Sequence, residues 1–228
     1  MMIYHALEEL IPKLEGLRTR IVYDFQAARD VLFFHHILPY FSSKRIFFVV
    51  YSDIACRKLK KKYEWMSELY PDIAKILDKT YSIKIGQNDS IAFGNLFDFI
   101  RENGSFKWLD ALADSLKKIK DEDMIVLSGF SLFVAINGQN ALREALRLID
   151  SLAENVTFFG FYQEGLYDDQ TNRLMEKFYD VIIRVKKEDE FTGFGETTFL
   201  VGVEQSVVGD IEPGFARFKI EDGKLVEV

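Results

Sequence analysis

The chain has 228 residues, 48% of them hydrophobic and 14% aromatic, so it can bury a large core and is not expected to be disordered. Its net charge of −7 argues against a broad electrostatic grip on nucleic acid, and its single cysteine, Cys56, excludes an internal disulfide. One cysteine and three histidines cannot supply a typical zinc set, so we expect no metal site. No signal sequence and no apolar run of transmembrane length is visible, so we expect a cytoplasmic protein without membrane contact.

Predicted strands and helices alternate over about the first 185 residues. In chain order they are a helix over 5–15, a strand over 18–25, a helix over 26–41, a strand over 44–52, a helix over 53–70 capped by Asp53, a strand over 80–85, helices over 89–102 and 106–119, a strand over 124–127, a helix over 140–152, a strand over 156–162, a helix over 169–178 and a strand over 181–185. This alternation is typical of a mainly parallel sheet with helices on both faces.

The C-terminal part of the sequence changes character. Three strands without intervening helices are predicted over 197–203, 216–220 and 225–228, and Asp222-Gly223 predicts a hairpin between the last two. These strands would extend the parallel sheet with antiparallel neighbours. No linker or composition shift marks a second domain, so we expect a single domain over residues 1–228.

The turn after the first predicted strand, residues 23–30, is where a doubly wound sheet would bind phosphate. Its sequence is Tyr-Asp-Phe-Gln-Ala-Ala-Arg-Asp, without a glycine to let backbone N–H groups wrap an anion. Two acids, Asp24 and Asp30, would meet a triphosphate there, and like charges about 4 Å apart repel by about 4 kcal/mol at an effective dielectric of 20. Arg29 is the only cation of this turn.

The order and spacing of these elements resemble the RecA-like ATPases of the KaiC and RadA type, and most closely an archaeal family that lacks intact Walker motifs. In such ATPases the motif GxxxxGK[ST] follows the first strand, and a later apolar strand, the Walker B strand, ends in Asp. The closing hairpin, from Phe218 through Gly223 to Val228, is also similar. The degenerate positions of this sequence are Tyr23, Asp24, Gln26, Ala28, Arg29 and Asp30 in the first motif and Ser128 at the end of the Walker B strand.

The resemblance implies an α/β, three-layer RecA-like P-loop-type fold over nearly the whole chain. Two interpretations of the degenerate turn stay open. In the first, Asp30 satisfies its helix start internally, no cofactor binds, and the protein is a non-catalytic pseudo-ATPase that binds a protein or peptide. In the second, Arg29 holds a nucleotide weakly while Asp53 positions water and metal. The simultaneous loss of the glycines, the lysine, the hydroxyl and the Walker B acid favours the first.

Two predicted loops follow strands, over residues 128–139 and 163–168. The resemblance implies that such loops face a central channel and touch DNA or a partner, and that the chain self-associates. The apolar members of these loops could equally be covered by neighbouring segments. The partner-binding residues predicted on this basis are Phe130, Phe133, Gln163, Leu166 and Tyr167.

Two further features have alternative interpretations. Basic residues over 57–62, next to Trp65, form either a phosphate or nucleic-acid contact or a solvated helix face, and an acidic chain with one such cluster favours the solvated face. His35 and His36 point about 100° apart on a helix and cannot share a metal easily, so we expect packed, hydrogen-bonded histidines.

Overall fold

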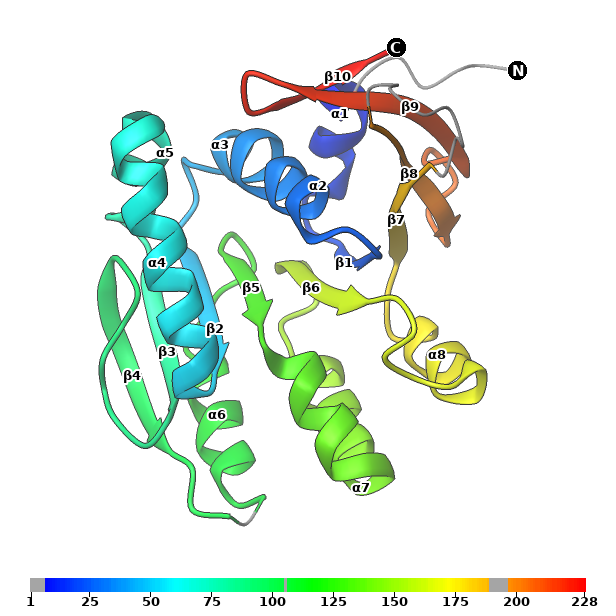
Figure 1. The fold of residues 1–228 in the computed structure, drawn as a ribbon. Helices are drawn as coiled ribbons and strands as arrows, with labels where there is room; N and C mark the ends of the chain where they lie inside the picture. Colours follow the sequence, from blue (N-terminus) through cyan, green and yellow to red (C-terminus); the bar gives the residue numbers. More distant parts are fainter. Residues whose placement is uncertain (1–6, 105, 189–196) are drawn as a thin grey trace. The chain divides into compact units, whose positions relative to one another are not determined.

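The computed structural model describes residues 7–104, 106–188 and 197–228. The chain divides into two compact units (Figure 1). We call residues 42–160 the central unit, and residues 1–41 together with 161–228 the terminal unit. The prediction of a single domain stays a prediction, and each unit is described by itself.

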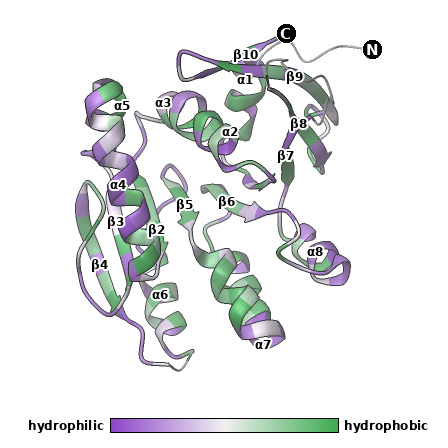
Figure 2. Cartoon of the chain, viewed as in Figure 1, coloured by the Kyte–Doolittle hydropathy of each residue, from purple (hydrophilic) through white to green (hydrophobic). Residues whose placement is uncertain are grey.

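The strands of the central unit are all parallel, in the order β4–β3–β2–β5–β6. Every residue of the inner strand β2 is buried, as its continuous apolar sequence predicts. Figure 2 colours this strand largely as hydrophobic. The strands are β2 (Ile46–Tyr51), β3 (Tyr81–Gly86), β4 (Asn95–Arg101), β5 (Met124–Ser128) and β6 (Thr157–Gln163), whose last three residues belong to the terminal unit.

Helices cover both faces of the central unit's sheet. Tyr51 packs against Trp108 of α6 and Phe130 of α7, with ring centroids 5.5 and 6.1 Å away. Phe48 points to the opposite face, since successive strand residues alternate, and contacts Phe93, which in turn contacts Tyr63 of α4. The helices are α4 (Asp53–Leu69), α5 (Pro71–Leu77), α6 (Trp108–Leu116) and α7 (Phe130–Asp150).

The terminal unit combines one parallel strand pair with antiparallel strands. β1 (Arg18–Tyr23) runs parallel to β7 (Val181–Lys187), and the strands β8 (Thr198–Ser206), β9 (Gly214–Glu221) and β10 (Lys224–Glu227) follow antiparallel. Asp222 and Gly223 both have positive φ, 47° and 76°, as a two-residue hairpin turn requires. The predicted hairpin and the antiparallel C-terminal strands are confirmed.

The helices of the terminal unit are short. Residues 26–41, predicted as one helix, are continuous but change type, because a π-helical turn, η2 (Leu32–Ile37), lies between α2 (Gln26–Val31) and α3 (Leu38–Tyr40). The predicted helix over 5–15 is described from α1 (Leu7–Leu10) through the 3₁₀ turn η1 (Ile11–Leu14), and its first two residues lie outside the described ranges. The remaining helix is α8 (Asp169–Glu176).

Strand β10 is fixed to the helical layer by a histidine. The backbone N–H of Leu225 donates to Nε2 of His36, 3.0 Å away. Burial, together with the smaller effects of the neighbouring His35 and Lys224, lowers the pKa of His36 to about 4. His36 is therefore a neutral acceptor at neutral pH, which agrees with the predicted packed, hydrogen-bonded histidine.

We expect this histidine to make the protein less stable in mild acid. The unfolded chain takes up a proton at the ordinary histidine pKa of about 6.5, whereas the folded chain resists it down to about pH 4. The contribution of His36 is therefore complete above about pH 6.5 and falls by about 1–2 kcal/mol by pH 5, allowing for its partial exposure. Urea denaturation at about pH 6.5 and at about pH 5 measures the free energy of unfolding at each pH. Between these two values it should fall more for the wild type than for His36→Gln, whose side chain accepts a hydrogen bond but does not titrate. An equal loss in both proteins would contradict the assignment.

Three sequence-based predictions are wrong in the central unit. Residues 89–102 contain the edge strand β4 instead of a helix, and residues 130–139, predicted as a loop, begin the long helix α7. The cap of α4 is Ser52, whose Oγ accepts from the N–H of Ala55, and Asp53 is the first helical residue. The mixed α/β fold class, with mostly parallel strands and helices, is confirmed. Across the described ranges, no helix combines the length and apolarity needed to cross a bilayer.

Candidate functional site

The elbow between β1 and α2, residues 23–30, is held by its own polar groups. The N–H of Asp24 donates to the carbonyl of Val185, 3.3 Å away, which continues the pairing of β1 with β7. Both carboxylate oxygens of Asp24 accept from the backbone N–H of Lys187, at 2.9 and 3.2 Å. Asp24 therefore closes the turn onto the end of β7 and adds a negative charge to the elbow.

Arg29, which the sequence predicts to replace the P-loop lysine, is packed inside the elbow. Its guanidinium carbon lies 4.7 Å from the ring centroid of Tyr23 and 4.8 Å from that of Phe161. One of its terminal nitrogens, Nη2, is 3.0 Å from Oδ1 of Asp30, and the Arg29 side chain is only 12% exposed. The only cation of the turn is therefore engaged by two aromatic rings and a carboxylate of the protein itself.

Asp30 has a different role from the one expected from the sequence. It was predicted to satisfy the helix start, but it lies at the fifth position of α2 and pairs with Arg29. The N-cap is Phe25, in an extended conformation and without a side-chain cap. The elbow therefore contains the Arg29–Asp30 ion pair in place of a capping carboxylate, while Nε of Arg29 is buried without a hydrogen-bond partner among the described residues.

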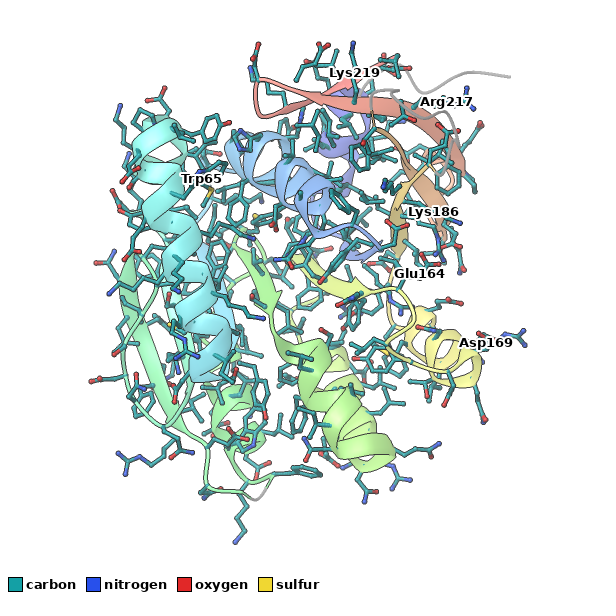
Figure 3. All side chains as sticks on the ribbon, in the orientation of Figure 1. Trp65, Glu164, Asp169, Lys186, Arg217 and Lys219 are labelled. Atoms are coloured by element: carbon teal, nitrogen blue, oxygen red, sulfur yellow. The ribbon has the colours of Figure 1, made fainter. Side chains whose placement is uncertain are left out.

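An open pocket of about 310 Å³ lies beside the elbow within the terminal unit. Phe25, 40% exposed, stacks on Phe199 with ring centroids 5.5 Å apart and forms one side of this pocket. Lys219, labelled in Figure 3, lines the pocket and is paired with Glu221 at 2.6 Å. The full lining is Phe25, Thr197, Phe199, Lys219, Ile220 and Glu221. The pocket presents apolar surface with a compensated pair of charges.

Ser128 ends β5 in the central unit, at the carboxyl edge of its parallel sheet. The next residue, Gly129, has φ 78°, and a Cβ there would come within 2.7 Å of the carbonyl oxygen of Tyr51. Only glycine fits this sharp turn into α7. The turn carries the hydroxyl of Ser128, and the correspondence of this residue to a Walker B acid stays a prediction.

A buried ion pair lies at the same edge of the central unit. Lys84 is 1% exposed, and its Nζ lies 2.5 Å from Oδ1 of Asp53 and 3.1 Å from the carbonyl of Ile85. Oδ2 of Asp53 accepts from the N–H of Gln87 at 3.1 Å. Burial raises the pKa of Asp53, but the hydrogen bonds from Lys84 and the backbone outweigh it, so the net pKa is lowered. The carboxylate is ionised and engaged through both oxygens.

The backbone around this pair is shaped to accommodate it. Ser52, between β2 and α4, has φ 83°, an uncommon conformation for a residue with a side chain. A Cβ on Gly86 would overlap both the Asp53 carboxylate and the Lys84 ammonium group. The sequence signal for this pair was a lysine inside the apolar strand β3, which the sequence analysis did not single out. Within the described part of the chain, no three His, Cys, Asp or Glu side chains gather as a metal site.

The predicted partner-binding residues separate into two groups. Phe130 and Phe133 are 2% and 1% exposed and belong to the core of the central unit, where they pack on Tyr51. Because α7 begins at Phe130, these rings are directed by a helix into the core and are not available to a partner in this conformation.

The turn between β6 and α8 carries the other three predicted residues. Gln163 is exposed, whereas Leu166 and Tyr167 are half-buried. Burial raises the pKa of Tyr167, and its carbonyl accepts from the Nδ2 of Asn172. The same asparagine accepts from the buried Arg20, whose Nη2 lies 2.7 Å from its Oδ1. The turn is therefore held in place by the hydrogen bonds of Asn172, and its role in partner binding stays a prediction.

Comparison of the structure with solved structures identifies similar chains, whereas the sequence matches no protein-family model and no curated protein. The protein PH0250 from Pyrococcus horikoshii aligns with a TM-score of 0.63 and 16% identity, covering 96% of each chain. The flagellar accessory protein FlaH from Methanocaldococcus jannaschii aligns at 0.59 and 11%, covering 99% of this chain and 97% of that one. A KaiC-like protein, PH0186 from P. horikoshii, aligns at 0.55 and 11%, covering 94% and 90%. The predicted RecA-like fold is thus confirmed.

Proposed function

We propose that this chain, which has a RecA-like fold, is a non-catalytic protein that binds a protein or peptide and does not hydrolyse ATP. The observation that carries the proposal is the state of Arg29. Its guanidinium packs on the rings of Tyr23 and Phe161 and is paired with Asp30. The side chain that would have to follow a transferred phosphoryl group is committed to the protein's own interior.

Electrostatics in the elbow support the same conclusion. A phosphate entering the elbow would approach the carboxylates of Asp24 and Asp30 and find no glycine through which to reach backbone N–H groups. A micromolar affinity is worth about 8 kcal/mol, and one misplaced carboxylate at about 4 Å opposes it by about 4 kcal/mol at an effective dielectric of 20. Expelling the Arg29 side chain from between its rings would add a further cost.

Asp53 of the central unit is not free to replace the missing catalytic groups. Asp53, which would position water and metal in a weak ATPase, is engaged by Lys84 and by the N–H of Gln87. Metal binding there would have to displace a buried ammonium group. This ion pair supports a structural role for Asp53 over a catalytic one.

A binding role is supported by exposed surface on the terminal unit. The pocket beside Phe25 is open and mostly apolar, with a volume that suits a side chain of a partner. Gln163 and its neighbours in the turn after β6 are exposed polar groups of the same unit. Both features favour contact with a protein or peptide.

The proposal is tested by phosphate release from Mg-ATP. We expect release by the wild type to equal that of Arg29→Ala and of a blank, because the Arg29 guanidinium is paired with Asp30 and packed on two aromatic rings. Release that exceeds the blank and disappears in Arg29→Ala would instead establish a weak ATPase that uses Arg29.

A further inference from the structure

The long helix α4 exposes a stripe of mixed apolar and basic character in the central unit. Five exposed residues follow one another at spacings of four, three, four and four positions, which places them on one face of a helix with 3.6 residues per turn. They are Ile54, Lys58, Lys61, Trp65 and Leu69, and we call them the α4 stripe. Figure 3 labels Trp65 on this helix.

The apolar members of the stripe are unusually exposed. Ile54, Trp65 and Leu69 have 57%, 54% and 56% of their surface accessible. The helix buries Cys56 and Met66 on its other side, so its own core face is complete without them. Trp108, the second tryptophan of the chain, is 4% exposed, as a tryptophan in a core would be. A large exposed aromatic side chain is a frequent anchor of protein interfaces.

The basic members of the stripe have no acidic partner. Residues 57–62 are Arg-Lys-Leu-Lys-Lys-Lys, five cations and no acid, in a chain whose net charge is −7. Among the described residues, Arg57, Lys58 and Lys61 form no ion pair, whereas lysines elsewhere, such as Lys75 and Lys117, are paired with nearby acids. Glu64 and Glu68 also lie on α4 and offset part of this charge. The stripe is therefore a positive centre flanked by apolar ends.

The chemistry that matches this pattern is an acidic amphipathic helix. The stripe extends over about 22 Å from Ile54 to Leu69, at a rise of 1.5 Å per residue. A partner helix of similar length could place acidic side chains opposite Lys58 and Lys61 and apolar side chains against Trp65 and Leu69. Nucleic acid fits less well, because only one of the three apolar side chains is an aromatic ring that can stack on a base, and because a single helix offers few phosphate contacts.

We propose that the α4 stripe is the surface on which this protein binds an acidic amphipathic helix of a partner protein. The inference rests on the proposed binding function and gives it a location and a partner chemistry. It replaces the interpretation of the basic cluster as a solvated face. Ion pairs formed across the stripe would steer association and weaken with salt, while Trp65 and the flanking apolar residues would supply contact area.

The test uses the full chain and a labelled synthetic peptide of about 18 residues, helical by design, with leucines near both ends and glutamates on the same face between them. We expect micromolar binding by fluorescence anisotropy, at least about tenfold weaker for the same peptide with glutamine in place of glutamate. Binding should also weaken at least about tenfold in the double variant Lys58→Glu/Lys61→Glu and in Trp65→Ala. The control Lys117→Glu/Lys118→Glu, on exposed lysines outside the stripe, should bind like the wild type.

Three results would overturn the inference. The first is no peptide binding at about 1 mM, and the second is equal peptide binding by the stripe and control variants. The third is a thymidine oligonucleotide of about 15 residues that binds more tightly than the peptide and whose binding the stripe variants abolish. The last would establish a nucleic-acid surface. Because phosphate release from Mg-ATP is measured separately, ATP turnover alongside peptide binding would refute only the non-catalytic assignment. Absence of both peptide binding and ATP turnover would refute only the assignment of the α4 stripe as a binding surface.

Discussion

Replacing Asp53 with alanine is expected to lower the free energy of unfolding by about 3 kcal/mol, because it leaves the Lys84 ammonium group buried without a counter-ion. Lys84 is 1% exposed, and among the residues that the structure describes Asp53 provides its only charged contact, at 2.5 Å. The carbonyl of Ile85 would remain as a hydrogen-bond acceptor, but it cannot neutralise the charge. Urea denaturation followed by far-ultraviolet circular dichroism measures the loss directly.

The double variant Asp53→Ala/Lys84→Met isolates the cause of this loss. Removing both charges and filling the space with an apolar chain of similar length should restore most of the stability. Lys84→Met alone should cost less than Asp53→Ala, because the remaining carboxylate is about one-third exposed and can reach water. A double variant as unstable as Asp53→Ala would show that the loss does not come from the unpaired lysine.

The second large effect is expected for Arg29→Ala, which should lower the free energy of unfolding by about 2–3 kcal/mol. The substitution removes cation–π contacts with Tyr23 and Phe161 and leaves Asp30, 17% exposed, without this ion pair. An arginine kept for a ligand would instead be poorly packed in the free protein, and its removal would change stability little. Thermal denaturation should show the melting temperature falling by about 4–12 °C, at about 2–4 °C per kcal/mol for a chain of this size.

Two controls accompany this experiment. Arg173→Ala removes an exposed arginine of α8 in the same unit and should change stability by less than about 0.5 kcal/mol. Arg29→Lys keeps the charge but loses the planar group that stacks on the rings, so it should lie between the wild type and Arg29→Ala. Equal stability of Arg29→Ala and the wild type would contradict the internal role of Arg29.

Much of the fold could be predicted because local patterns and tertiary packing agree. β2 and β5 are uninterrupted apolar runs, and both are buried in the parallel sheet. Asp222-Gly223 forms the predicted hairpin, because this pair tolerates the positive φ values of the turn. In these elements the sequence pattern and the surroundings demand the same conformation.

The failures occur where tertiary contacts overrule local signals. β4 lies at the edge of the central unit's sheet, and its residues are exposed or half-buried except Ile100, so they lack the clean alternation of a strand. Residues 130–139 were predicted as a loop after a strand, but Phe130, Phe133 and Val134 are buried and hold the start of α7 as a helix. Gly138 departs from helical geometry, with φ 69° and ψ −155°, and marks a kink inside α7.

The candidate site was predictable in composition but not in geometry. The absence of glycine and the presence of Asp24, Arg29 and Asp30 are visible in the sequence. Phe161, whose ring packs on Arg29, is distant from Arg29 in the sequence, so no local pattern predicts this contact. Likewise, Lys84 and Asp53 come from different elements, and only the sheet brings them together.

The most direct test of the central claim is a calorimetric titration of the wild-type chain with Mg-ATP at about 1 mM, where a ligand with a dissociation constant of about 10 μM would also stabilise the fold by about 2.7 kcal/mol. Because Arg29 is stacked inside the elbow and two carboxylates border it, we predict no heat of binding beyond dilution. Saturable binding with a micromolar dissociation constant, abolished by Arg29→Ala, would contradict the account.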